Sequence, residues 1–119
     1  MGGPPEGYRT VTPRIAVADV VGQVAFLRAA FGGVGEVVDG RPAEILIGDS
    51  LVMVGSIIER EAFPAFLYLY VDDADETHAM AVEAGALTVE EPRDTPYGDR
   101  RAMVRDPFGN LYQIAHRLI

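Results

Sequence analysis

Apolar residues along this chain first alternate over a short run and then recur at helical spacing. Residues 11–17 predict a strand, with Ile15 and Val17 on one face. Asp19 is placed to cap a helix that Gly32-Gly33 would end. The apolar residues of this helix are spaced at three or four positions: Val20, Val24, Leu27 and Phe31. Three short strands are expected next, near Glu36–Val38, Ala43–Ile47 and Leu51–Val54.

The second half repeats this order after a polar linker over residues 56–64. A strand is expected over Ala65–Val71 and a helix over Asp75–Ala84, which Gly85 would end. Three strands are again expected after the helix: Leu87–Glu90, Ala102–Arg105 and Leu111–Ala115. One βαβββ unit has too little sheet to bury its helix and its opposite face. We therefore predict one α+β domain over residues 1–119, with modules at about 8–56 and 64–119. Together they would form a curved mixed sheet with helices outside and a cleft inside.

Composition narrows the class of protein further. The chain has no cysteine, which excludes disulfides, thiolate metal sites and cysteine nucleophiles. Neither a signal peptide nor an apolar run of about 18 residues is present, so we expect a cytoplasmic protein with no membrane contact. A net charge of −8 argues against nucleic acid as a partner. This charge either only keeps a small protein in solution or favours a cationic ligand.

Two motifs resemble the vicinal oxygen chelate superfamily, which includes glyoxalases and bleomycin-resistance proteins. The first is Val71-Asp72-Asp73-Ala74-Asp75 before a helix that ends in Glu83-Ala84-Gly85-Ala86. The second is Tyr97-Gly98-Asp99-Arg100 followed by the run from Arg105 to Leu111. The resemblance covers nearly all of the chain after Thr10 and implies the two-module fold. Within the second motif, Asp106-Pro107-Phe108-Gly109-Asn110 has the chemistry of a tight turn, so we expect its role to be structural.

The resemblance also implies four positions for the ligands of a divalent metal. In this sequence they fall on Thr12 and Phe66 in the first strands and on Met53 and Gln113 in the last strands. A shift of two residues would place Arg14 or Tyr68 there instead. Only Gln113 could coordinate a metal, and one neutral amide does not make a site. We therefore expect no metal or other cofactor.

Other chemistry-bearing residues do not form a recognisable catalytic set. His78 is expected to be half-buried on the second helix, and His116 to lie on the strand face opposite Gln113. Asp99 and Glu44 are candidate bases, but the sequence identifies no partner for either of them. These residues favour a binding function and leave enzymatic activity as an open alternative.

Strand alternation predicts what faces the cleft. In the strand over Ala65–Val71, Leu67 and Leu69 would pack under the helices, whereas three aromatic side chains would face the cleft. Such a face suits a flat organic ligand. The alternative is that the aromatics only fill the cleft or a dimer interface. The predicted ligand-binding residues are Thr12, Arg14, Met53, Phe66, Tyr68, Tyr70, Arg101, Met103 and Gln113.

The function that we predict from the sequence is metal-free binding. The chain resembles bleomycin-resistance proteins, which implies sequestration of a drug-like or aromatic natural product, antibiotic resistance and a homodimer. The competing hypotheses are a metal-dependent lyase, epimerase or dioxygenase with a degenerate site, and a domain without a ligand. The sequence leaves open whether the modules pair within one chain or swap between two.

Overall fold

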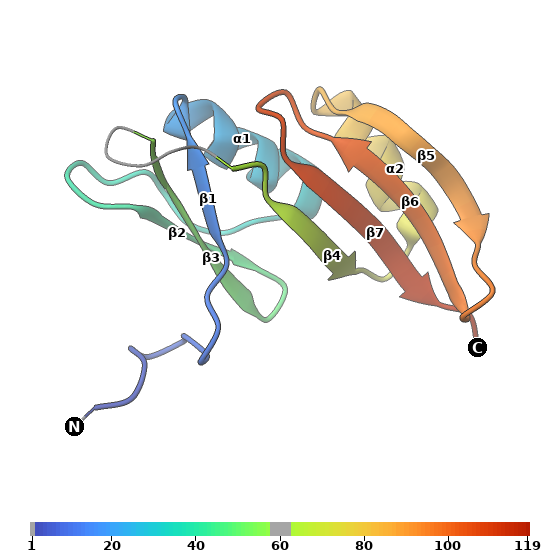
Figure 1. Cartoon of the computed structure of the whole chain (residues 1–119), viewed down its shortest axis with the longest axis horizontal. Helices are drawn as coiled ribbons and strands as arrows, with labels where there is room; N and C mark the ends of the chain where they lie inside the picture. The colour runs from blue at the N-terminus through green and yellow to red at the C-terminus, as the bar shows by residue number, and fades with distance from the viewer. Residues whose placement is uncertain (1, 58–62) are drawn as a thin grey trace.

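The computed structural model describes residues 2–57 and 63–119, and it confirms the predicted α+β class with two related modules (Figure 1). Most of the expected linker lies outside the described residues. The first module, or N-module, contains β1 (Arg14–Val17), α1 (Val20–Phe31), β2 (Ala43–Ile47) and β3 (Ser50–Ser56). The second, or C-module, contains β4 (Phe66–Tyr70), α2 (Ala74–Glu83), β5 (Leu87–Asp94), β6 (Asp99–Arg105) and β7 (Leu111–Arg117). No helix among the described residues is long and apolar enough to cross a membrane.

Each module pairs its first strand in parallel with its last strand. The N-module sheet has the order β1-β3-β2, and the C-module sheet has the order β4-β7-β6-β5. The two sheets share no strand pairing, and α1 packs against α2 behind them (Figure 1). The single curved sheet expected from the sequence is therefore not formed within one chain. Instead, each sheet buries one face against the helices, and its other face, here called the outer face, points away from them.

The prediction of a strand at Glu36–Val38 is wrong. Val34 forms only an isolated bridge with Leu46, and the chain then leaves the sheet. Gly35 explains the departure, because it has a φ of 145° and lies so close to β2 that an added Cβ would sit 2.2 Å from the carbonyl oxygen of Glu44. A turn at Gly40 follows, with a φ of 82°. Pro42, directly before β2, has no N–H to donate to a neighbouring strand.

Both helices begin after a capping aspartate, and the sequence predicts the first of these caps, Asp19. The Asp19 carboxylate accepts the N–H of Gly22 at 2.8 Å, and the Asp73 carboxylate accepts the N–H groups of Asp75 and Glu76. These bonds satisfy backbone donors that have no partner within the helix. Helix α1 ends at Gly32, which adopts the left-handed conformation at a φ of 68°. Both helices lie within about one residue of their predicted bounds.

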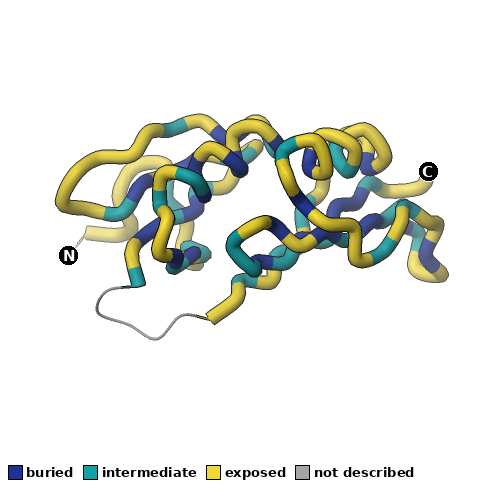
Figure 2. The backbone as a smooth tube through the Cα atoms, turned by 90° about the horizontal axis from the view of Figure 1, so that it is seen from above, coloured by how far each residue is buried: buried dark blue, intermediate teal, exposed yellow. Residues whose placement is uncertain are grey.

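The two modules share one core. Phe26 and Phe31 of the N-module lie around Tyr112 of the C-module, with ring centroids 5.9 and 5.0 Å from the Tyr112 ring. Figure 2 shows buried backbone in the middle of the molecule and exposed backbone at both termini. Because α1 packs into the C-module, the modules cannot separate without exposing apolar surface.

A buried polar network joins the modules at the same place. The Gln23 amide of α1 donates to Asp106 at 2.8 Å and accepts from Asn110 at 2.8 Å, and the Tyr112 hydroxyl donates to Asp106 at 2.7 Å. All four side chains are almost completely buried, so each needs these partners. Asp106 and Asn110 belong to the turn that the sequence predicts to be structural. Beyond shaping a turn, these residues hold α1 against the C-module.

Candidate functional site

The exposed side of β4 carries the three predicted aromatic residues. Phe66 is 60 % exposed, Tyr68 39 % and Tyr70 62 %, whereas Leu67 and Leu69 pack against the core. Alternation along the strand therefore places the aromatic side chains on the outer face of the C-module sheet. Met103 of β6 and Gln113 of β7 are half-buried on the same face, directly across from Tyr68 in the register β4-β7-β6.

A buried carboxylate organises two of these aromatics. Asp99 at the start of β6 is 1 % exposed, and it accepts hydrogen bonds from the hydroxyls of Tyr68 at 2.6 Å and Tyr70 at 2.9 Å. The Arg117 guanidinium donates to its other oxygen at 2.7 Å. Ala115 lies between Tyr70 and β6 in the sheet, and its short side chain leaves room for the two phenol side chains to cross β7.

These contacts determine the charge state of the cluster. Hydrogen bonds from the Tyr68 hydroxyl, then from the Tyr70 hydroxyl and the Arg117 guanidinium, lower the pKa of Asp99. Burial, reinforced by the bond to Asp99, raises the pKa of Tyr68, and the Asp99 bond raises the pKa of Tyr70. Asp99 is therefore ionised at neutral pH and both tyrosines are protonated. A carboxylate held in this way is a weak base, so the arrangement favours fixed hydrogen bonding over proton transfer.

Arg101 forms a second polar cluster on this outer face. Its guanidinium donates to Glu90 at 2.6 Å and to the Tyr97 hydroxyl at 2.9 Å. The Tyr68 hydroxyl and then Arg101 lower the pKa of Tyr97. Tyr97 is therefore in contact with both Tyr68 and Arg101.

Sequence reasoning missed the partners within these clusters. Tyr97, Glu90 and Arg117 were not predicted, and Asp99 was considered only as a base without a partner. Strand parity gave a usable signal, because Asp99, Arg101 and Met103 alternate along one strand and therefore share a face. Whether the tyrosine side chains of β4 reach Asp99 depends on their rotamers, and strand parity does not predict rotamers.

The metal positions are occupied by residues that do not fit a metal. Strand register pairs Arg14 with Met53 and Tyr68 with Gln113. Thr12 precedes β1, and Phe66 pairs with Leu111. A guanidinium, a thioether, a phenol and an amide are not the donor set of Zn²⁺, Fe²⁺ or Mn²⁺. Within residues 2–57 and 63–119, no group of three His, Cys, Asp or Glu side chains could hold a metal ion.

Both histidines lie away from the outer faces. His78 is half-buried on α2 and its Nε2 is 2.8 Å from the Thr88 hydroxyl. The His116 Nδ1 accepts the N–H of Ala74 at 2.8 Å, where α2 begins. His116 therefore faces the helix layer, on the side of β7 opposite Gln113, as the sequence predicts.

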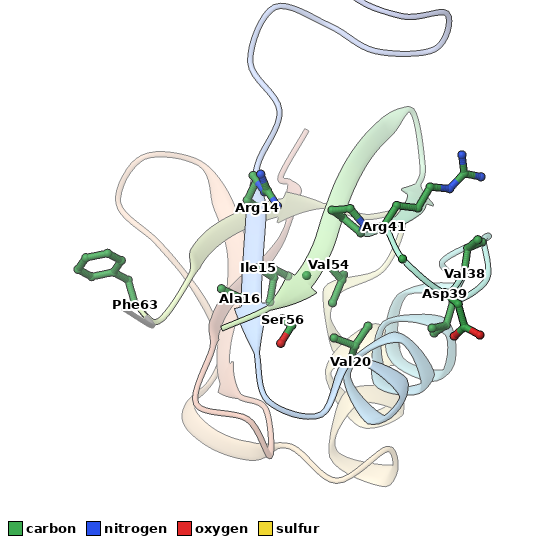
Figure 3. Close-up of a pocket in the computed structure, with 14 residues that line it drawn as sticks. Arg14, Ile15, Ala16, Val20, Val38, Asp39, Arg41, Val54, Ser56 and Phe63 are labelled. Atoms are coloured by element: carbon green, nitrogen blue, oxygen red, sulfur yellow. The ribbon is translucent and has the colours of Figure 1, made fainter. Parts of the chain in front are cut away.

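The outer face of the N-module is built differently. Tyr8, from the segment before β1, donates its hydroxyl to Glu44 of β2, and burial together with this carboxylate raises the pKa of Tyr8 to about 12. A hollow of about 1340 Å³ lies between the ends of β1 and β3 and the segment over residues 37–42 (Figure 3). It is lined by Arg14 but by none of the predicted C-module residues. The predicted site residues thus form two groups, one on each module.

Known proteins match the chain in sequence and structure. The family model described as the Glyoxalase/Bleomycin resistance protein/Dioxygenase superfamily matches residues 12–114. The crystal structure of TioX from Micromonospora sp. ML1 is 26 % identical, with a TM-score of 0.80 over 91 % of this chain and 98 % of that chain. A glyoxalase/bleomycin resistance protein/dioxygenase family enzyme from Burkholderia phytofirmans PsJN is 22 % identical, with a TM-score of 0.77 over 90 % and 97 %.

A curated relative matches over a shorter stretch. The putative glyoxylase CFP32 of Mycobacterium tuberculosis is 42 % identical over 48 residues, which are 40 % of this chain and 18 % of that protein. The family model, by contrast, spans both modules and includes the β6–β7 turn that contacts α1. The chain therefore belongs to the Glyoxalase/Bleomycin resistance protein/Dioxygenase superfamily.

Proposed function

We propose that this chain is a metal-free binding protein that sequesters an aromatic, drug-like molecule. The observation that carries the proposal is the outer face of the C-module, where exposed aromatic rings stand beside fixed hydrogen-bonding groups. Superfamily membership supports it, because the family description includes bleomycin resistance. Sequestration needs no reacting group, only a face that matches the ligand.

The tyrosine pair is suited to stacking. The rings of Tyr68 and Tyr70 are 5.3 Å apart and inclined by 54°, and both hydroxyls are bonded to Asp99. Since these bonds already fix the rings, a planar ligand would lose little side-chain entropy by packing against them. Phe66 extends the aromatic surface along the same strand.

The alternative is a metal-dependent lyase, epimerase or dioxygenase, and the name of the curated relative favours it. Such an enzyme needs three or four ligands that converge on one metal, and the residues at the family's positions do not fit this role. Elemental analysis of protein purified without chelator separates the two functions. We expect well under one equivalent of Zn, Fe, Mn, Ni or Co per chain, and a stoichiometric metal that survives dialysis would establish the enzyme instead.

We further propose a homodimer in the cytoplasm. The exposed rings on β4 form an apolar patch of the kind that a partner commonly covers. Strands β1 and β4 each lie at the edge of a sheet, and neither pairs with the other within the chain. A second copy could pair with these edges and bring the outer face of one N-module towards the C-module of its partner.

The binding proposal is tested by titrating the protein with a neutral planar compound, 2-naphthamide, and following the backbone amide resonances by NMR. We expect the largest shifts on β4 and at Gln113. Saturable binding elsewhere, or no binding by this and related aromatic compounds, would favour the hypothesis that the rings only fill an interface.

A further inference from the structure

The hollow in the N-module is a feature that the aromatic face does not explain. It exists because residues 37–42 leave the sheet where a third N-module strand was expected. Its apolar lining includes Val20 at the start of α1, and Val37 and Val38 on the segment over residues 37–42; Figure 3 shows Val20 and Val38 beside it. Val37 and Val38 are 40 % and 43 % exposed, so this wall is left open to solvent.

Arg14 lies at the edge of this hollow and has no hydrogen-bonding partner among the described residues. Its guanidinium makes no hydrogen bond or ion pair with any residue in 2–57 or 63–119. It lies close over Gly55, where an added Cβ would be 3.4 Å from its Nη2 atom. By contrast, the carboxylates that share the outer faces, Glu44, Glu90 and Asp99, all have donors.

The charge around the hollow is opposite to that of the whole chain. Arg14, Arg41 and Asp39 are the charged residues among its described lining, which gives a net charge of +1 in a chain of net charge −8. Arg41 extends away from Arg14 in Figure 3, whereas Arg14 lies over Gly55 in the lining of the hollow. A ligand that suits this hollow would therefore be apolar and carry one anionic group.

We propose that this hollow is a second ligand site, which binds a small apolar carboxylic acid in its ionised form. The carboxylate bonds the Arg14 guanidinium, whose planar set of N–H donors matches two carboxylate oxygens. The apolar body covers the valines on the opposite wall. Within one chain this site is separate from the aromatic row on β4, because it lies on the other module.

The test uses 2-naphthoate as the probe and 2-naphthamide as its uncharged counterpart. NMR titration should show naphthoate shifting the amide resonances of residues 37–41 and 54–56, with an affinity about tenfold above that of naphthamide at this site. Arg14→Gln should remove that difference. Arg28→Gln is the matched control, because it removes one positive charge from the exposed surface of α1 and should leave the difference intact. Val38→Asp should weaken naphthoate binding by repulsion, at a position exposed enough to tolerate the change.

Several results would overturn the proposal. Equal binding of the two probes, or a preserved difference in Arg14→Gln, would show that Arg14 does not recognise the anion. Naphthoate shifts confined to β4 would place the ligand on the aromatic row, which leaves the proposed function standing while this inference fails. Loss of naphthoate binding at concentrations where the protein dimerises would show that a second copy occupies the hollow. As a further control, Tyr68→Ala should leave naphthoate binding at residues 37–41 unchanged. The same substitution should weaken the binding of naphthamide on β4.

Discussion

Asp99 determines how the aromatic side chains of the C-module are presented. A phenol on an exposed strand ordinarily samples several rotamers, but Tyr68 and Tyr70 are both anchored to one carboxylate. Arg117 neutralises that carboxylate on its other oxygen. The two rings therefore keep a fixed orientation in which a ligand can stack on them, because both hydroxyls are hydrogen-bonded to Asp99.

At this scale the first prediction concerns Tyr68. Replacing it by alanine removes a ring on which a planar ligand stacks, and aromatic pairs contribute about 0.5–1.5 kcal/mol beyond area burial. We expect Tyr68→Ala to weaken binding of 2-naphthamide about tenfold, measured by NMR or fluorescence titration. Tyr68→Phe is the matched control and should bind nearly as well, because it keeps the ring and loses only the bond to Asp99. Equal affinities for all three proteins would exclude Tyr68 from the site.

The second prediction follows from the pKa of Asp99. Its pKa is lowered in the folded protein, so its ionised form stabilises the fold above the ordinary carboxyl pKa of about 4. This contribution is lost as the pH falls through the lower folded value. Urea denaturation should therefore show Asp99→Asn less stable than the wild type at pH 7, with the difference shrinking as the pH falls from about 5 to about 2. A difference that stays constant over this range would show that folding does not lower the pKa of Asp99.

At the scale of elements, β4 separates binding from stability. Its two leucines pack under the helices, and its aromatics face outward. Leu69→Ala would leave a core cavity and should lower the free energy of unfolding by about 2–5 kcal/mol. Tyr68→Ala should cost less, since Tyr68 is 39 % exposed. Chemical denaturation of both variants gives the comparison, and equal losses would mean that the outer face is a packed interior.

Elements were predictable from the sequence where one local signal decided them. Asp19 marks the start of α1, and alternation in β4 separates its two faces, because caps and strand parity depend on neighbouring residues alone. The prediction of a strand over residues 36–38 is wrong because the path of this segment depends on a tertiary contact, the close approach of Gly35 to β2. The register of β1 and β4 against the last strands was open by two residues for the same reason, since pairing partners lie far apart in sequence.

For the whole molecule, the central question is what covers the outer faces. Exposed rings and unpaired edge strands on a chain of this size lead us to expect a symmetric dimer of about 26 kDa, twice the 12.8 kDa of one chain. Sedimentation at tens of micromolar protein measures this mass directly. A stable monomer under those conditions would contradict the dimer and leave each outer face open to ligands from solution.

The packing of α1 into the C-module has a consequence for a chain that has been cut. A protease that cleaves between residues 57 and 63 would break the covalent link but not the Gln23 network or the contacts of Phe26 and Phe31 with Tyr112. The two fragments would then stay together as a noncovalent complex and migrate as one species under native conditions. When expressed separately, each fragment would lack the core contacts that the other fragment supplies. We therefore expect each fragment to fold only after the two are mixed.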